Sequence, residues 1–302
     1  MRLALALLLL AAVPAWAGGP VPVAATSTDL QSLIESVGGE LVRVVSLAPA
    51  VHEPHQVEVK PGQLAELRAA ALLVRVGLDH EPWLARILQA VNDPRFAPGS
   101  PDVVDCSKGI PLLQAETARV RSERGVHVHG FGNTHYWLDP ENARPITASI
   151  LDALARLRPA ERARFEANRE RFLTDLESRL ARWTRAMAPY RGTRAVVVHE
   201  TWPYFARRFG LVITAALEPS PGVPPSPSHL ASTIQHMKAG GVGLLIAGPE
   251  SDAALVDRVA AQGGARAVVL VPSVGGDPAA RDYLSLFDVN IRRLTEVLAT
   301  AR

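Results

Sequence analysis

Three histidines of this chain lie in sequence frames that suit metal binding. They are His55, which follows Pro54; His135, which opens the segment HYWLDP; and His199, which opens the segment HETWPYF. Neutral imidazole is the commonest side-chain metal ligand, and three imidazoles from separate loops suit borderline-soft divalent ions such as zinc. Because the three are far apart in the sequence, only a folded tertiary structure can bring them together.

Each histidine is expected at the end of a rigid element. His199 directly follows a predicted strand, 194–198, and ligands of open α/β sheets bind beyond the carboxyl ends of strands. His55 lies in a loop after the predicted strand 41–47, and His135 lies just before a helix that begins at Asp139 and Pro140. We expect the first lobe to offer two ligands and the second lobe one, with the ion in the cleft. Asp139 is expected to act as a helix N-cap and not as a metal ligand.

Strand-like and helix-like segments alternate in both halves of the chain. The pattern predicts an α/β fold with two lobes, each with a mainly parallel sheet flanked by helices. The predicted strands are 41–47, 71–76, 102–106, 194–198, 211–217, 243–247 and 265–271. The predicted helices are 61–70, 81–91, 139–157, 202–209, 228–239, 251–262 and 279–301.

One long, charged segment lies between the two halves. Residues 160–188 contain no glycine or proline, and the apolar side chains recur at helical spacing. This apolar stripe consists of Phe165, Phe172, Leu176, Leu180, Trp183 and Met187. A helix of this length would be about 45 Å long. We therefore predict one rigid linking helix, 158–189, between an N-terminal lobe at 18–157 and a C-terminal lobe at 190–302, which would restrict hinge motion.

The N-terminus predicts export. Arg2, an apolar stretch at 3–13 and the small-x-small sequence ending at Ala17 are typical of a secretory signal peptide, 1–17, cleaved after Ala17. The apolar stretch is shorter than the roughly 20 residues that span a bilayer. We expect a soluble protein of the bacterial periplasm. The formal net charge of +2 gives no argument for a nucleic-acid partner. Cys106, the single cysteine, excludes an intramolecular disulfide and is expected to be a buried filler.

The motifs resemble those of a known family. The matching segments are Pro54-His55, 71–78 with 81–84, His135 to Pro140, His199 with 204–211, and 283–290. In order and content they are similar to the metal-binding subgroup of ABC-transporter solute-binding proteins, the ZnuA/TroA/AztC-like zinc and manganese receptors. The resemblance covers essentially the whole chain after the signal peptide, and it implies two lobes joined by a rigid helix.

The resemblance also bears on the identity of the metal. Manganese receptors of this kind carry a carboxylate at the position of His199 and an aspartate near Pro272 and Ser273, whereas this chain has neither. Manganese prefers oxygen ligands, so zinc is favoured. Glu218, after the strand 211–217, is the candidate fourth ligand, and water is the alternative.

The remaining histidines are assigned lesser roles. His127 and His129 look like a very short version of the family's His-rich loop and could be an auxiliary zinc-collecting segment. His52 and Glu53 flank His55 as outer-shell or entry-path groups. His80, His229 and His236 lie in no recognisable motif.

We therefore expect a periplasmic high-affinity receptor that binds Zn(II) as cargo and delivers it to an ABC permease and its ATPase. A periplasmic zinc chaperone is a conceivable further partner, and a monomer is expected. A manganese receptor of the same family is one alternative. Another is a zinc-dependent hydrolase in which three histidines hold a metal-bound water; it is less favoured because no accompanying motif such as HExxH is present. An adhesin or zinc-storage protein with the same site is a third.

Overall fold

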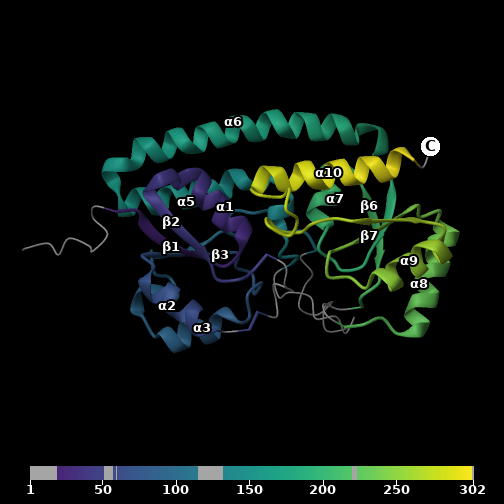
Figure 1. The fold of residues 1–302 in the computed structure, drawn as a ribbon, viewed down its shortest axis with the longest axis horizontal. Helices are drawn as coiled ribbons and strands as arrows, with labels where there is room; N and C mark the ends of the chain where they lie inside the picture. The colour runs from purple at the N-terminus through teal and green to yellow at the C-terminus, as the bar shows by residue number, and fades with distance from the viewer. Residues whose placement is uncertain (1–18, 51–56, 59, 115–131, 220–222, 301–302) are drawn as a thin grey trace, which may run out of the picture.

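The computed structural model describes residues 19–50, 57–58, 60–114, 132–219 and 223–300. Within these ranges the chain forms two four-stranded parallel sheets, each flanked by helices, with one long helix between them in sequence (Figure 1). The predicted fold class is confirmed.

The first sheet has the strand order β2-β1-β3-β4. Its strands are β1 (Val21–Ala25), β2 (Val42–Ser46), β3 (Leu72–Arg75) and β4 (Val103–Asp105). Its helices are α1 (Thr28–Gly38), α2 (Pro61–Ala69), α3 (Leu84–Val91) and α5 (Ala143–Leu157). Neither β1 nor α1 is among the predicted elements. A proline argues against a central strand, yet Pro22 lies in the strand that pairs on both sides, where its carbonyl accepts from Ala71 N–H.

The second sheet repeats the arrangement in the order β6-β5-β7-β8. Its strands are β5 (Arg194–Val197), β6 (Val212–Ala216), β7 (Leu244–Ala247) and β8 (Arg266–Val269). Its helices are α7 (Pro203–Phe209), α8 (Pro227–Gly240), α9 (Ala253–Gly263) and α10 (Tyr283–Ala299).

Three predicted helix starts were wrong. Helix α5 begins at Ala143 and not at 139, because Pro140–Asn142 forms a 3-10 turn after Asp139. Helix α10 begins at Tyr283 and not at 279, because Asp282 forms a capping box with Ser285. Helix α3 begins at Leu84 and not at 81, because the Glu81 side chain hydrogen-bonds back to the end of β3 and Pro82 lies in a turn.

The predicted linking helix is present as α6 (Arg162–Met187), with a short 3-10 turn at either end. Figure 1 shows it running along one side of the molecule, past both lobes. Its apolar stripe is buried except for Leu180, which is half-buried, and the helix packs on α1 and α5 of the first lobe and on α10. One continuous cluster of buried apolar side chains extends from β1 through α6 to α7 and α10. The lobes therefore share a core in addition to their separate ones.

No helix in the described part of the chain has both the length and the apolar character needed to cross a bilayer.

Candidate metal centre

His135 lies at the junction of the two lobes, directly before the 3-10 turn Tyr136–Leu138. Its side chain is 3% exposed, and the Asn133 side-chain oxygen lies 3.0 Å from its backbone nitrogen and 3.2 Å from its Nδ1. With Nδ1 protonated by this contact, Nε2 is the nitrogen that can bind a metal. An outer partner that fixes the tautomer in this way is usual for metal-binding histidines.

His199 approaches from the second lobe. It follows β5, as predicted, and its ring centroid lies 5.8 Å from that of His135. The Nδ1 atom of His199 lies 2.9 Å from Oε2 of Glu218, which follows β6. A carboxylate on Nδ1 orients the ring. Glu218 therefore lies beside His199, and its role as the fourth ligand, with water as the alternative, stays a prediction.

His80, which lies in no sequence motif, is a neighbour of His135. Its ring centroid lies 5.5 Å from that of His135 and 5.0 Å from that of Trp137, and the residue is 2% exposed. Its Nδ1 is 2.9 Å from Thr134 Oγ1. His80 is not among the predicted site residues, although it follows the predicted strand 71–76, at the carboxyl end of a parallel strand, where ligands often bind.

The loop that carries His80 has an unusual backbone. Gly77, Leu78 and Asp79 all have positive φ, at 83°, 57° and 58°. For Leu78 and Asp79 this left-handed conformation is unfavourable by about 1–3 kcal/mol each. A Cβ on Gly77 would lie only 2.3 Å from Asp105 Oδ1, so glycine is needed there.

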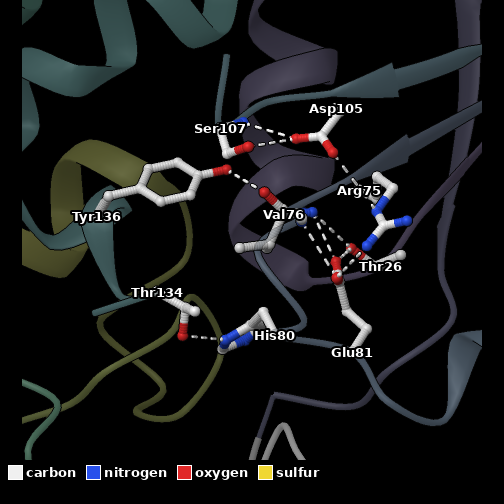
Figure 2. Close-up of polar contacts among 10 residues, drawn as sticks. Thr26, Arg75, Val76, His80, Glu81, Asp105, Ser107, Thr134 and Tyr136 are labelled. Carbon is white, nitrogen blue, oxygen red and sulfur yellow. Dashed lines mark hydrogen bonds and ion pairs between the residues drawn. The ribbon is translucent and has the colours of Figure 1, made fainter. Parts of the chain in front are cut away.

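Glu81 holds this loop in place (Figure 2). Its buried carboxylate accepts from Val76 N–H at 2.6 Å, from Gly77 N–H at 3.1 Å and from Thr26 Oγ1 at 2.6 Å. Burial raises the pKa of Glu81, and the nearby positive charge of Arg75 opposes that rise. The Glu81 side chain thus fixes the strained loop by two hydrogen bonds from its backbone and ties it to Thr26 by a third.

Polar contacts across the junction fix the two lobes beside these histidines. The Asn133 amide donates to the Glu200 carbonyl at 2.8 Å, and the Tyr204 hydroxyl donates to the Asn133 carbonyl at 3.1 Å. Asp139 accepts from Glu141 N–H, which confirms its predicted capping role, and it also forms a bidentate ion pair with Arg208 of α7 at 2.6 and 3.0 Å.

The outcomes for the other predicted residues are uneven. His55, His127, His129, His52 and Glu53 lie outside the described residues. Within the described ranges, no three His, Cys, Asp or Glu side chains are grouped so that they could hold a metal ion. Of the remaining residues, His229 contacts the Ala216 carbonyl and His236 is exposed. Cys106 is buried with a raised thiol pKa, as expected of a filler.

Two parallel-sheet lobes, a long helix between them in sequence, and histidines from both lobes at their junction define the class of metal-binding solute-binding proteins. The model of one family, described as the periplasmic component A of the zinc-uptake complex (ZnuA), matches residues 23–297. The chain belongs to this family.

Relatives and solved structures agree with that assignment. The chain is similar to the high-affinity zinc uptake system protein ZnuA of Yersinia pestis, at 26% identity over 76% of each chain. It is also similar to the zinc-binding lipoprotein AdcA of Streptococcus pneumoniae, at 22% identity over 93% of this chain. The chain spans only 56% of that AdcA and 60% of a metal-binding protein of Treponema pallidum.

Among solved structures, a ZnuA crystal structure matches with a TM-score of 0.75 and 27% identity, over 92% of this chain and 99% of that one. The manganese complex of FpvC from Pseudomonas aeruginosa has the same fold, with a TM-score of 0.78 at 22% identity, over 94% of this chain and all of the other.

Proposed function

We propose that this protein is a receptor that binds Zn(II) as cargo through His55, His135 and His199 and delivers it to an ABC permease and its ATPase. The observation that carries the proposal is the pairing of His135 and His199, which face each other from opposite lobes with ring centroids 5.8 Å apart. Both rings have Nδ1 on an oxygen, Asn133 Oδ1 or Glu218 Oε2, so both can offer Nε2 to one ion.

The donor chemistry favours zinc over manganese. The two described candidate ligands are nitrogen donors, and positions 272 and 273, after β8, hold proline and serine in place of a carboxylate. Nitrogen-rich sites suit zinc, whereas manganese prefers oxygen. The names of the similar proteins from Yersinia pestis and Streptococcus pneumoniae point to the same metal.

The proposal includes the remaining organisation of the chain. Residues 1–17 would be removed on export to the periplasm, leaving lobes at 18–157 and 190–302 joined by the helix 158–189. His127 and His129 would collect zinc for the main site, and a periplasmic chaperone would be a further partner. The protein would act as a monomeric receptor and not as an enzyme, in keeping with its family of uptake components.

Metal titration of the purified protein, without residues 1–17, tests the proposal. Competition against a chromogenic chelator should give one tightly bound Zn(II) per chain, and Mn(II) should not displace it. The variants His55→Ala, His135→Ala and His199→Ala should each weaken binding, whereas His236→Ala, which removes an exposed histidine of α8, should not. Three alanine variants with unchanged affinity would disprove the ligand assignment. Tight manganese binding would instead favour the alternative manganese receptor.

A further inference from the structure

We propose that Thr28 and Asp29, at the start of α1, form a proton-dependent clasp that holds the second-lobe segment 271–276 against the first lobe. The segment lies between β8 and α10 and belongs to neither a helix nor a strand. The inference goes beyond the proposed function, because it concerns the attachment of the lobes and applies to the metal-free protein.

Side chains, and not neighbouring strands, bind the backbone at the start of this segment. The Val271 N–H donates to Asn290 Oδ1, and the Val271 carbonyl accepts from Asn290 Nδ2, both at 2.8 Å. The next carbonyl, that of Pro272, accepts from Trp137 Nε1 at 3.0 Å. Asn290 belongs to α10, whereas Trp137 lies two residues after His135 at the junction. The start of the segment is thus tied first to α10 and then to the junction.

The clasp itself lies at Val274. The Val274 carbonyl accepts from Thr28 Oγ1 at 2.8 Å, and the Val274 N–H donates to Asp29 Oδ1 at 2.9 Å. Two consecutive side chains of the first lobe therefore satisfy both backbone polar groups of one residue of the second lobe. A Cβ on Gly275 would lie 3.1 Å from the Ala50 Cβ, so the segment also packs closely on the first lobe at that point.

The carboxyl group of Asp29 is buried without a counter-ion. The residue is 0% exposed, and within the described ranges its Oδ2 has no hydrogen-bond partner. A carboxylate in this position would lose its hydration without compensation from a cation. The protonated acid avoids that cost and still offers Oδ1 to the Val274 N–H. The geometry of the clasp therefore fits the neutral form of Asp29.

The groups that contact Asp29 leave burial as the dominant influence on its charge. Burial raises the pKa of the Asp29 carboxyl to about 7, although the Val274 N–H and the Ser273 hydroxyl oppose the rise. The N-terminus of α1 also favours a negative charge, but it does not reverse the direction of the shift.

Neighbouring titratable groups do not supply the missing positive charge. Tyr283 of α10 stays uncharged, because burial and the charges of Asp139 and Asp29 raise its pKa well above the usual value. Asp277, in the loop that continues the segment, is paired with Arg293 of α10. Because the pKa of Asp29 is raised while the clasp is closed, the clasp is strongest below about pH 4 and weakens as the pH rises towards 7.

The clasp is linked to His135 through Trp137. The Trp137 ring donates to the Pro272 carbonyl, two residues before Val274, and its centroid lies 5.3 Å from that of His135. Loosening the segment would therefore remove one of the contacts that hold Trp137 beside His135. In this way the protonation of a carboxyl group in α1 would act on the junction where the histidines of the two lobes meet.

The test measures amide hydrogen exchange of the segment 271–276 by mass spectrometry, in the metal-free protein without residues 1–17, at pH 5 and pH 8. After correction for the intrinsic exchange rate, the wild type should lose roughly tenfold or more of its protection at the higher pH. Asp29→Asn should show no such loss, because asparagine keeps the acceptor for the Val274 N–H and cannot ionise. Exchange in β7, Leu244–Ala247, reports global unfolding and should not change.

Thr28→Val is the matched control. It removes the donor to the Val274 carbonyl without removing a titratable group, so it should lower protection at both pH values and keep the pH dependence of the wild type. The same pH dependence in the wild type and in Asp29→Asn would overturn the proposal. A wild-type segment whose protection does not respond to pH would overturn it as well.

A second measurement requires no variant. In the metal-free wild type labelled with carbon-13 at the aspartate side-chain carboxyls, one resonance should titrate with a midpoint of about 7. If no aspartate titrates above pH 6, Asp29 is ionised at neutral pH and the proposal fails. Neither measurement involves zinc, so a protein that binds no zinc would defeat the proposed function and leave the clasp in place.

Discussion

The two lobes present their histidines to the junction in different ways. In the first lobe His80 and His135 are 2% and 3% exposed, and their neighbours Thr134 and Asn133 hold Nδ1 from the same short segment. In the second lobe the side chain of His199 is 11% exposed and is held by Glu218, whose side chain is 24% exposed. The first-lobe half of the site, His80 and His135, is buried, and His80 follows a strained backbone turn. The second-lobe half, His199, is held by a more accessible side chain, that of Glu218.

Because of this difference we expect the two lobes to contribute unequally to metal binding. A buried pair with fixed tautomers loses little entropy when it binds an ion, so under the proposed function the first lobe would contribute preorganised affinity. His199 and Glu218 are closer to solvent, where water can compete for the carboxylate and where uptake and release of the ion would begin. The predictions below test whether the two halves are as unequal as the structure indicates.

The largest effect is expected from the ligands themselves. His135→Ala should weaken zinc binding by more than His199→Ala, and both by more than the roughly 10- to 100-fold that loss of an outer partner causes. The reason is that His135 is buried at the centre of the cluster, between His80 and His199. Chelator competition with both variants measures the difference. Equal losses would mean that the two halves contribute alike.

A second effect concerns the pH dependence of the free energy of unfolding, through a buried carboxyl group at the contact between the lobes. Asp29, at the start of α1, is fully buried and accepts from Val274 N–H of the second lobe at 2.9 Å. Burial raises the pKa of Asp29 from 3.8 to about 7, while the hydrogen bond from Val274 opposes the rise. Between these values the folded state binds more protons than the unfolded state, so the stability contributed by this group is present below pH 4 and is lost as the pH rises towards 7.

Asp29→Asn should remove this pH dependence. The asparagine oxygen can still accept from Val274 N–H but cannot ionise, so the variant should gain stability relative to the wild type as the pH rises from 4 to 7. The gain should level off above pH 7, at no more than about 4 kcal/mol. Urea unfolding of both metal-free proteins across this range measures it. A difference that stays constant with pH would show that Asp29 is ionised throughout.

A third, smaller effect separates orientation from ligation in the second lobe. Glu218→Ala should reduce zinc affinity about tenfold, because His199 loses the contact at Nδ1, and Glu218→Gln should largely preserve it, because the amide oxygen can replace that contact. Asn133→Ala, which removes the corresponding partner in the first lobe, should reduce affinity more, since Asn133 also donates to the Glu200 carbonyl. If Glu218 binds zinc directly, the glutamine variant should be nearly as weak as the alanine variant.

Much of the fold could be predicted because it depends on local pattern. The stripe of α6 recurs at helical spacing, and the apolar runs of the second sheet are separated by glycines and prolines, so these elements were found within a few residues. β1 and α1 were missed because Pro22 obscured a central strand. The predicted start of α3 was too early because the Glu81 side chain accepts hydrogen bonds from the backbone N–H groups of Val76 and Gly77. These contacts keep Glu81 in the loop before the helix.

The site was less predictable because it depends on contacts between residues that are distant in sequence. His135 and His199 stand in recognisable segments, but the position of His80 beside them follows from contacts distant in sequence, such as Tyr136 to Val76 and Thr134 to His80. A three-residue turn with positive φ at Leu78 and Asp79 has no strong sequence signature, because neither residue favours that conformation.

The smallest effect should be the change of shape when the metal is removed. The lobes share a continuous apolar core along α6 and α10, and the buried carboxylate of Asp139 is paired with Arg208 across the junction. Rotation of one lobe would expose this core and leave the Asp139 charge unpaired, a penalty of several kcal/mol that binding one ion cannot readily offset. Small-angle scattering of the zinc-loaded and metal-free protein should therefore give superimposable curves, with any adjustment confined to side chains and loops near His199. A large increase in the radius of gyration on zinc removal would show that the lobes separate and that the first-lobe half is not preorganised in the way its burial indicates.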